Sequence, residues 1–463
     1  MLLQYIMKII VVGTGFASIP AISLLVKSGL KPTVIDVGNK INNQKKHLLK
    51  KNIFIKKKNY DDYLCLGGLS NVWTGVIDKY DEVDLLNWPI NKNTFETYYN
   101  KLNDLLYKSE IYNFISKKNN FLNYEIRKEQ VSQEKFIQSD ESLLLKNTSI
   151  LTSEFKNSNK SDDLYFNLLK PLNFSEYIEK LINETKINYV KGKVINIGEK
   201  KNEVEIITLD PDNNKKTYKA DYLFLGCGSA STLKLIQNSL NIFDKNLRLK
   251  NNKKIVFPVY FNQREKIKNN IKNFNNIYPI FQLNFRSKNL GNVYSQISNL
   301  NITLFKYFFP NLSNSNFFRN ISSFFNKFGF SYLSLDPKYG DEFTFDKNGE
   351  IIVFRKNYSK NYLLKNLNDL FKNNILNSEI KHIKFPFFRN SLSGNHFGSV
   401  FPMKEIKKEK FESDIFGRTA EFKKISILDS SIFTTLSSKP PTLTIMANSY
   451  RIVNSVLTKN FFN

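Results

Sequence analysis

Short apolar runs followed by glycine mark the start of the chain. Residues 8–12, KIIVV, form a continuous β-branched run, which predicts a strand buried on both faces of a parallel sheet. Residues 13–29, GTGFASIPAISLLVKSG, predict a glycine turn that opens an amphipathic helix, and residues 32–38, PTVIDVG, predict a second strand. The order strand, turn, helix, strand predicts a βαβ unit.

Four residues of this unit have the types and spacing that favour binding of a dinucleotide. Gly13 permits the tight turn, and Gly15 lets backbone N–H groups approach a pyrophosphate at the helix N-terminus. Ser18 stands at the third glycine position, so the fingerprint is imperfect. Asp36 ends the second strand, where it would accept hydrogen bonds from the adenosine ribose. The alternative is a packing turn of an α/β fold that binds no nucleotide.

The same pattern returns late in the chain. Residues 220–228, ADYLFLGCG, predict another buried strand and glycine turn before a helix, and residues 425–429, ISILD, predict a further strand. Residues 442–457 carry apolar side chains at helical spacing after Pro440 and Pro441, which predicts a terminal helix. Such a late return to the nucleotide-binding unit is typical of flavin-binding chains and is less expected of a simple nicotinamide dehydrogenase.

Two long regions are less regular. Residues 107–173 are polar, and residues 250–385 mix Asn- and Lys-rich loops with alternating strand candidates such as 341–355. The Phe-rich stretch at 304–330 is interpreted as core or as a lid over a substrate, with an amphipathic lipid-binding surface as the alternative.

Composition narrows the class of protein. A chain of 463 residues with 41% hydrophobic residues predicts two domains with large cores. The net charge of +26 would suit an anionic partner, but the chain contains no nucleic-acid-binding module, and runs such as 45–58 are interpreted as solvated surface. Two cysteines and three histidines predict a reducing, cytoplasmic setting and no metal site. The apolar start lacks a signal-peptide pattern, so we expect no leader or membrane anchor.

Taken together, these segments resemble the glucose–methanol–choline family of flavin oxidoreductases. The resemblance rests on VVGTGFAS…VID, GGLSNVW, NWPI…YY, ADYLFLGCGSASTLKLIQNS and HFGSVFPM…ISILDSSIFTT…PPTLTIMANSYRI, roughly half the chain in the order of the family. It implies an α/β fold in which an FAD-binding Rossmann-like domain (1–106, 185–249 and 386–463) is interleaved with an α+β substrate domain (107–184 and 250–385) that contains an antiparallel sheet.

The resemblance also implies which residues hold the cofactor. Besides Gly13, Gly15, Ser18 and Asp36, Val194 would contact adenine through its backbone. The remaining positions would lie along the flavin, its ribityl chain or the pyrophosphate, and they are Gly67, Gly68, Ser70, Asn71, Cys227, Gly228, Asp429, Pro441 and Thr442. The positive end of the last helix would face the pyrimidine edge of the flavin, where reduction adds negative charge.

His396, in NHFGSVFPM, aligns with the active-site histidine of the family and is expected to take the hydroxyl proton while a hydride passes to flavin N5. The family places a second His or Asn just before the last helix, but Pro440 stands there in this chain. Lys439 or Asn395 is expected to replace that missing partner of the substrate oxygen. The glycine of the His-x-x-Gly motif is also shifted, to Gly398.

The resemblance therefore implies an FAD-dependent oxidoreductase that acts on a CH–OH group of a small alcohol or sugar, and it favours a substrate from a sugar or polysaccharide pathway. Three alternatives stay open at this point: an NAD(P)-dependent dehydrogenase, a flavin-bound protein without catalysis that contacts a membrane surface, and a different flavoenzyme such as an amine oxidase. The peripheral membrane contact is the less favoured possibility.

Overall fold

The computed structural model describes residues 7–38, 64–71, 73, 75–107, 142–147, 152–154, 170–200, 203–261, 281–299, 328–374, 380–389 and 396–458. The Lys-rich run at 45–58, Asn395 and residues 304–327 of the Phe-rich stretch lie outside these residues. Within the described ranges, no helix is both long and apolar enough to cross a membrane.

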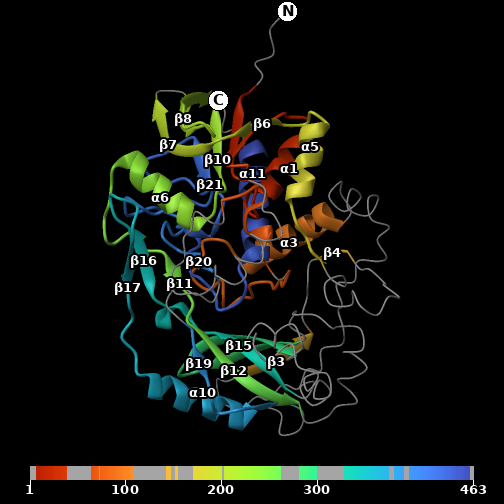
Figure 1. Cartoon of the computed structure of the whole chain (residues 1–463), viewed down its shortest axis with the longest axis vertical. Helices are drawn as coiled ribbons and strands as arrows, with labels where there is room; N and C mark the ends of the chain where they lie inside the picture. Colours follow the sequence, from red (N-terminus) through yellow and green to blue (C-terminus); the bar gives the residue numbers. More distant parts are fainter. Residues whose placement is uncertain are drawn as a thin grey trace, which may run out of the picture.

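A parallel sheet forms the centre of one half of the molecule (Figure 1). Its five strands are β21 (Ile425–Ile427), β10 (Tyr222–Leu225), β1 (Ile9–Val12), β2 (Thr33–Asp36) and β6 (Asn188–Lys191), in that order. The predicted strands at 8–12, 32–38, 220–228 and 425–429 are confirmed. All four residues of β1 and of β10 are buried, as the continuous apolar runs require.

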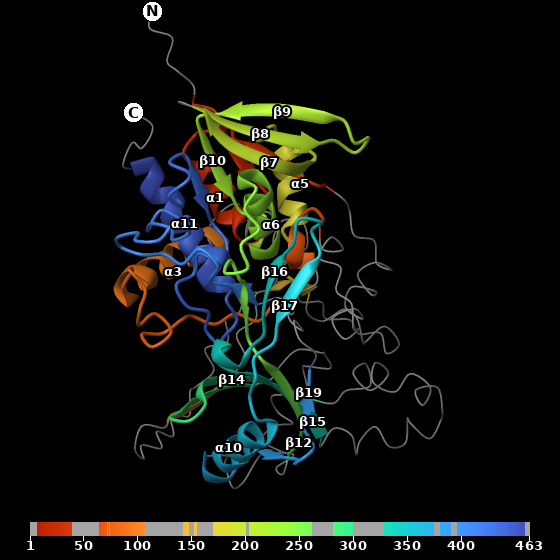
Figure 2. The ribbon, with the colours of Figure 1, turned by 90° about the vertical axis from the view of Figure 1, so that its left-hand side faces the viewer.

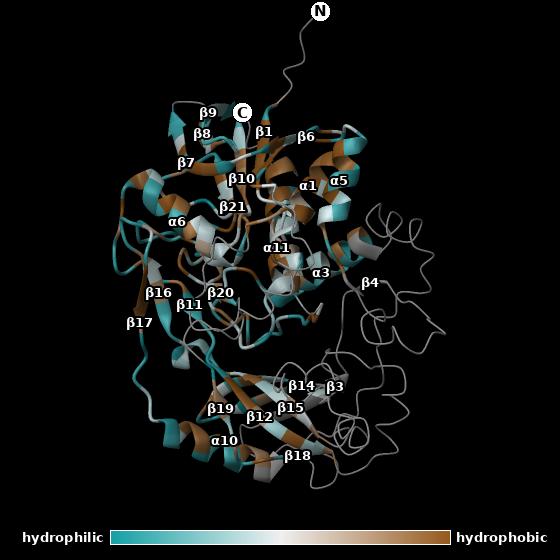
Figure 3. Cartoon of the chain, viewed as in Figure 1, coloured by the Kyte–Doolittle hydropathy of each residue, from teal (hydrophilic) through white to brown (hydrophobic). Residues whose placement is uncertain are grey.

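Helices cover this sheet, and Figure 3 shows apolar residues concentrated on the parallel strands and on α1. They are α1 (Ser18–Lys27), α3 (Lys92–Tyr107), α5 (Ser175–Asn183), α6 (Ser229–Leu240) and α11 (Thr442–Thr458). Helix α11 packs between α1 and α3: Ser449 Oγ donates to the Ala17 carbonyl, and Tyr99 OH lies 2.7 Å from Thr444 Oγ1. The predicted terminal helix is thus the helix that joins the two others.

A second, three-stranded antiparallel sheet packs beside α6, at the top of Figure 2. It consists of β7 (Lys193–Lys200), β8 (Glu203–Leu209) and β9 (Lys215–Ala220). Alternate residues of β8 are buried, which is the pattern of a sheet with one covered face. The Ile197 N–H of β7 donates to Ser239 Oγ of α6 at 2.9 Å, so this sheet is fixed to the helix that follows β10.

The other half of the molecule is built on a seven-stranded antiparallel sheet. Its members are β18 (Ile380–His382), β12 (Lys254–Phe261), β15 (Phe328–Ser334), β14 (Gly291–Asn299), β13 (Phe281–Ser287), β3 (Ser142–Asn147) and, paired with β12, β19 (Phe387–Phe388). Short elements complete the described structure: β4 (Thr152–Glu154) with β5 (Lys170–Pro171), β11 (Lys250–Asn251) with β20 (Phe397–Gly398), β16 (Glu342–Phe345) with β17 (Ile351–Phe354), and the 3₁₀ turns η2 (Gly68–Asn71), η4 (Pro337–Tyr339) and η5 (Ser430–Ile432).

The two faces of the seven-stranded sheet differ. On one face, Ile255, Phe257 and Val259 of β12 are buried in a cluster with Leu363 and Leu367 of α10 (Lys360–Asn374), the helix below the sheet in Figure 1. Side chains alternate along a strand, so the residues between them point to the other face. The register places Lys254 of β12 beside Ser334 of β15 and Tyr294 of β14 on that second face.

The mixed α/β architecture with a parallel and an antiparallel sheet agrees with the expected fold class. Two segments assigned to the substrate domain, however, join the core around the parallel sheet. Helix α5, which the sequence analysis assigned to the substrate domain, packs in the core of the parallel sheet, where Tyr177 and Ile178 are buried. The β16–β17 hairpin also joins that core through Phe343 and Phe345. Their apolar side chains find their partners in the larger core, which sequence position alone does not reveal.

Candidate functional site

The turn after β1 brings the first two glycines into different surroundings. Gly13 has φ +94°, and a Cβ at this residue would lie 2.7 Å from the Gly226 carbonyl oxygen, so the turn requires glycine. At Gly15, a Cβ would meet no atom within 4 Å. The backbone at the start of α1 therefore borders open space, as a surface that holds a flat or anionic ligand would.

Ser18, expected to line a pyrophosphate turn, directs its hydroxyl into the protein instead. It is fully buried, and its Oγ donates to the Val12 and Gly226 carbonyls at 3.3 and 3.1 Å. The serine therefore ties α1 to the ends of β1 and β10. This is the packing role of the third glycine in dinucleotide-binding turns, performed here by a small polar residue.

Asp36 lies at the carboxyl end of β2 and faces the same turn. Its Oδ2 accepts a hydrogen bond from Thr14 Oγ1 and its Oδ1 accepts one from the Gly38 N–H, both at 2.8 Å. Burial raises the pKa of Asp36 to about 6, although these hydrogen bonds act to lower it. A carboxylate has about four lone-pair sites, so capacity remains for hydroxyl donors of a ligand.

The paired glycines of 64–71 approach this turn. The Gly67 N–H donates to Thr14 Oγ1 at 2.8 Å, and a Cβ on Gly68 would lie 3.5 Å from Gly15 Cα. The side chains of Ser70 and Asn71 are used inside the loop: Ser70 Oγ donates to the Gly67 carbonyl at 2.7 Å and Asn71 Nδ2 to the Gly68 carbonyl at 2.9 Å. Both side chains thus fix the shape of a loop whose glycine backbone borders the Gly15 turn.

A second glycine turn follows β10. Gly228 has φ +88°, begins α6 as its cap residue, and has no atom within 4 Å of the position a Cβ would take. Cys227 adjoins the first turn, since a Cβ on Gly13 would lie 3.0 Å from Cys227 Cα. Burial raises the pKa of the Cys227 thiol to about 12, and Asp429 adds to that rise, so this thiol stays protonated at neutral pH.

Asp429 is fully buried between the second turn and η5. Its carboxylate accepts hydrogen bonds from Thr232 Oγ1, from Ser431 Oγ at 2.6 Å and from the Ser431 N–H at 3.0 Å. Burial raises its pKa, while these bonds and one from the Gly228 backbone act to lower it. Asp429 therefore orders the start of α6 and the chain after β21, both of which border the Gly228 turn.

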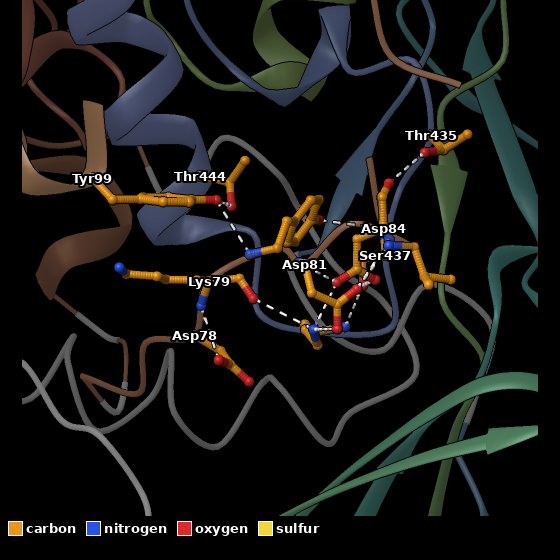
Figure 4. A network of polar contacts seen from close by, with 11 residues as sticks. Asp78, Lys79, Asp81, Asp84, Tyr99, Thr435, Ser437 and Thr444 are labelled. Atoms are coloured by element: carbon orange, nitrogen blue, oxygen red, sulfur yellow. Dashed lines mark hydrogen bonds and ion pairs between the residues drawn. The ribbon is translucent and has the colours of Figure 1, made fainter. Parts of the chain in front are cut away.

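Lys439, just before α11, takes part in a polar network that Figure 4 shows around Asp81, Asp84 and Ser437. The Lys439 ammonium is buried and contacts Asp81 Oδ2 at 2.6 Å and Asp84 Oδ2 at 2.7 Å. Ser437 Oγ also donates to Asp84 Oδ1. Pro441 follows, and its carbonyl accepts the Ile445 N–H of α11 at 2.8 Å, so Thr442 opens the helix.

The charges in this network fix the ionisation of Lys439. Burial acts to lower its pKa, but the charges of Asp84, Asp78 and Asp81 outweigh burial, and the pKa is raised. The pKa of Asp81 is lowered, since Lys439 outweighs the effect of burial. The ammonium already donates to two carboxylates. It therefore has less capacity to bind a substrate oxygen, which is the role expected for Lys439 from the sequence.

His396 lies immediately before β20, where both flanking halves of the molecule meet. The Phe397 carbonyl after it accepts hydrogen bonds from Ser229 Oγ of α6 and Ser430 Oγ of η5. His396 Nδ1 itself lies 3.2 Å from Lys254 Nζ at the start of β12. Lys254 Nζ also donates to Ser334 Oγ at 2.8 Å. The histidine is thus anchored on the Gly228 side. Through Lys254 it contacts the sheet face turned away from α10, which we call the polar face after Lys254, Ser334, Gln296 and Asn284.

His382 has a different environment. It lies on β18 with its ring stacked on Phe371 of α10 at 3.8 Å, and its Nε2 lies 3.1 Å from Ser331 Oγ. Burial lowers its pKa to about 3, so the ring is neutral under ordinary conditions. This histidine belongs to the apolar core below the sheet.

The structure brings most of the expected residues together and adds two. Gly13, Gly15, Asp36, Gly67 and Gly68 surround one turn, and Cys227, Gly228 and Asp429 surround the adjoining turn. Val194 lies on β7, at a register shift of the strand, within the sheet that packs on α6. Asn395 lies outside the described residues.

Sequence reasoning missed Thr14 and Lys254. Thr14 stands inside the glycine motif, and its position between Gly13 and Gly15 is the signal that could have identified it. Lys254 contacts a histidine 142 residues away. The only signal in the sequence was weak. Lys254 opens a strand in which Ile255 and Phe257 face the core, so the alternation of side chains directs Lys254 to the opposite face.

Comparison with known proteins identifies the architecture. No protein-family model matches this sequence, and no curated protein matches it. The structure is similar to the crystal structure of pyridoxine 4-oxidase from Mesorbium loti, with a TM-score of 0.55 over 98% of this chain and 99% of that chain. This chain shares the fold of that oxidase. The sequence identity is 10%, so the likeness shows the fold alone.

Proposed function

We propose that this protein is an FAD-dependent oxidoreductase that oxidises a CH–OH group. In this proposal, a Rossmann-like domain around the parallel sheet binds the cofactor, and the antiparallel sheet forms the floor of the substrate site. One observation carries the proposal: Gly15 and Gly228 both border open space where helices begin at the carboxyl ends of adjacent parallel strands. That edge is where open α/β sheets bind dinucleotides.

The residues around this edge fit FAD. The pyrophosphate would lie at the start of α1, whose cap residue Ala17 supplies no side-chain hydrogen bond to the first turn. Asp36 would accept the ribose hydroxyls, and the glycine backbone of 67–68 would run beside the flavin and ribityl chain. Val194 would contact adenine, and the positive end of α11 at Thr442 would face the pyrimidine edge. FAD would supply a hydride acceptor.

His396 is proposed as the base that receives the hydroxyl proton. It lies between the Gly228 turn and the polar face of the antiparallel sheet. The Phe397 carbonyl joins its segment to Ser229 of α6, next to that turn, and its own ring contacts Lys254 of the sheet. A substrate lying on that face would present its carbinol group to the histidine and to the cofactor edge together. Positioning of this kind is one of the contributions that a protein makes to hydride transfer.

The proposed substrate is a carbohydrate or an activated sugar. The partly exposed amide groups of Gln296 and Asn284 on the polar face offer donors and acceptors for sugar hydroxyls. A second candidate is an aromatic alcohol, because the protein with the similar fold is a pyridoxine 4-oxidase and the same face carries Tyr332 and Tyr260. Aromatic rings stack on either kind of ligand.

The decisive experiment is an anaerobic absorbance spectrum of the purified protein before and after addition of sugars, aliphatic alcohols and pyridine methanols. We expect a flavin band near 450 nm, roughly, that bleaches with one class of compound, since hydride transfer reduces the cofactor. A persistent band with every class would favour the flavin-bound protein without catalysis. A colourless protein that gains no band with added FAD but binds NAD would favour the nicotinamide-dependent dehydrogenase.

The proposal includes a cytoplasmic location and a small-molecule partner. Both rest on composition, namely two cysteines and no nucleic-acid-binding module. Thiol labelling checks the first point, because Cys65 and Cys227 are expected to stay free thiols in a reducing compartment.

A further inference from the structure

The contact between Lys254 and His396 permits only two arrangements of protons. An ammonium group has donors and no acceptor, and an imidazolium has a donor on both nitrogens, so these two cations cannot share a hydrogen bond. At a separation of 3.2 Å between Lys254 Nζ and His396 Nδ1, one partner has to accept. Either an ammonium donates to Nδ1 of a neutral ring, or Nδ1–H donates to a neutral amine.

The two arrangements give His396 opposite chemistry at Nε2. When Lys254 is an ammonium, Nδ1 is the acceptor and the neutral ring carries its proton on Nε2, where it can only donate. When Lys254 is an amine, Nδ1 carries the proton and Nε2 presents a lone pair, which can receive one. The base proposed above therefore exists only in the second arrangement.

We infer that Lys254 is the positioning residue that makes His396 a base, and that it receives the substrate proton at the end of a His396–Lys254 relay. This inference rests on the proposed function. The O–H bond of the substrate breaks and its proton passes to His396 Nε2, while the Nδ1 proton passes to the Lys254 amine and leaves an ammonium. The carbon-bound hydrogen leaves with its electron pair to the oxidised flavin, and the O–H electron pair becomes the second bond of the carbonyl.

The surroundings keep the two side chains in place for this exchange. Lys254 Nζ is held by Ser334 Oγ at 2.8 Å on the adjacent strand, and His396 is held by the bonds of Phe397 to α6 and η5. The relay also accounts for Pro440 at the position of the second family residue, since Lys254 completes the pair from another strand. Lys439 is engaged with Asp81 and Asp84 and serves a different purpose.

Other titratable groups lie on or next to the elements around this pair. They are Tyr332, Tyr294, Arg389, Lys250, Lys253 and Asp429. Burial raises the pKa of Tyr332 to about 12 and that of Tyr294 well above the usual range, so both phenols stay neutral at ordinary pH. Burial also raises the pKa of Asp429.

Nitrogen NMR of protein labelled in its imidazole rings tests the inference without any cofactor, because the chain has three histidines. As pH rises, we expect His396 to change from the Nε2–H to the Nδ1–H tautomer, while His382, stacked on Phe371, stays unchanged. In Lys254→Arg, His396 should remain in the Nε2–H tautomer, because a guanidinium stays charged. A wild-type ring that stays Nε2–H across the whole range in which the protein is folded would overturn the relay.

Kinetics separate the relay from a structural role of Lys254. If the relay operates, Lys254→Arg should slow anaerobic flavin reduction by about 10²–10⁴-fold, and Lys254→Met should retain about tenfold more activity than Lys254→Arg, since its histidine is free to adopt the basic tautomer. A role in charge or packing predicts the reverse order. Failure of the wild-type protein to bind or reduce flavin would refute the proposed function, whereas the NMR result would still decide the tautomer exchange.

Discussion

The two faces of the seven-stranded sheet are formed by the same strands but have different environments. Toward α10, β12 presents Ile255, Phe257 and Val259 in a closed apolar core, and the histidine on that side, His382, is stacked and neutral. Toward the parallel-sheet half, the same strand begins with Lys254, which contacts His396. Alternation of side chains along a strand places the two histidine environments on opposite sides of one layer.

This difference shows why a rare residue type is a weak indicator of function. The chain has three histidines, and composition treats them alike. The structure separates two of them by their partners: a hydroxyl and an aromatic ring surround His382, and the Lys254 side chain lies beside His396. In the relay proposed above, the neighbour of His396 changes its charge when it takes up the ring proton, whereas His382 has a neutral hydroxyl as its partner.

The largest effect is expected from His396→Ala. Flavin binding should survive, and alcohol-driven flavin reduction should fall by about 10²–10⁴-fold, the usual range for loss of a positioned base. His382→Phe is the matched control, since it keeps an aromatic ring against Phe371 on the other face and should leave reduction unchanged. Rapid anaerobic reduction of the bound flavin measures both; equal losses in the two variants would refute the distinction between the faces.

The next largest effect is expected from Lys439→Met. This change leaves Asp84 as a buried, unpaired carboxylate and should lower the free energy of unfolding by about 3–5 kcal/mol. Lys79→Met is the control, because the Lys79–Glu96 pair is exposed and its loss should cost about 0–1 kcal/mol. Denaturant unfolding measures both variants.

A double variant shows whether the unpaired charge is the cause. Lys439→Met with Asp84→Asn should recover part of the stability that Lys439→Met loses, since the buried charge is gone. A double variant as unstable as the single one would instead point to lost packing around residues 77–84. That segment borders the polar face, because Gln282 Nε2 donates to the Ile77 carbonyl.

His382, on the apolar face, should make the free energy of unfolding depend on pH. Its folded pKa of about 3 lies below the usual value near 6.5, so the unfolded chain takes up a proton first as pH falls. The stability it contributes is complete above about pH 6.5 and is lost toward pH 3, by up to about 4 kcal/mol. His382→Phe should remove this part of the acid loss in denaturant unfolding; identical pH curves would exclude a buried neutral ring.

Local patterns predicted the strands and glycine turns of the parallel sheet well, and they predicted the contacts of the antiparallel sheet poorly. The strands and turns at 8–38 and 220–228 are encoded by neighbouring glycines and β-branched residues, so a short window contains their cause. The contacts of Lys254 with His396 and of Lys439 with Asp84 join residues 142 and 355 positions apart. No periodicity encodes such pairs, because register and packing create them only after the sheets form.

Asp36 should have the smallest effect on stability, and its dependence on pH should have the opposite sign to that of His382. Burial raises its folded pKa to about 6, above the unfolded value near 3.9, so the folded protein without cofactor holds an extra proton between these values. Stability from this group is complete below about pH 4 and falls by at most about 2–3 kcal/mol as pH rises to 6. Asp36→Asn should remove that fall and make the acid loss due to His382 steeper in the same window. An unchanged curve would mean that the Asp36 carboxyl is well solvated, which would also weaken its assignment as the partner of a ribose in a closed cofactor site.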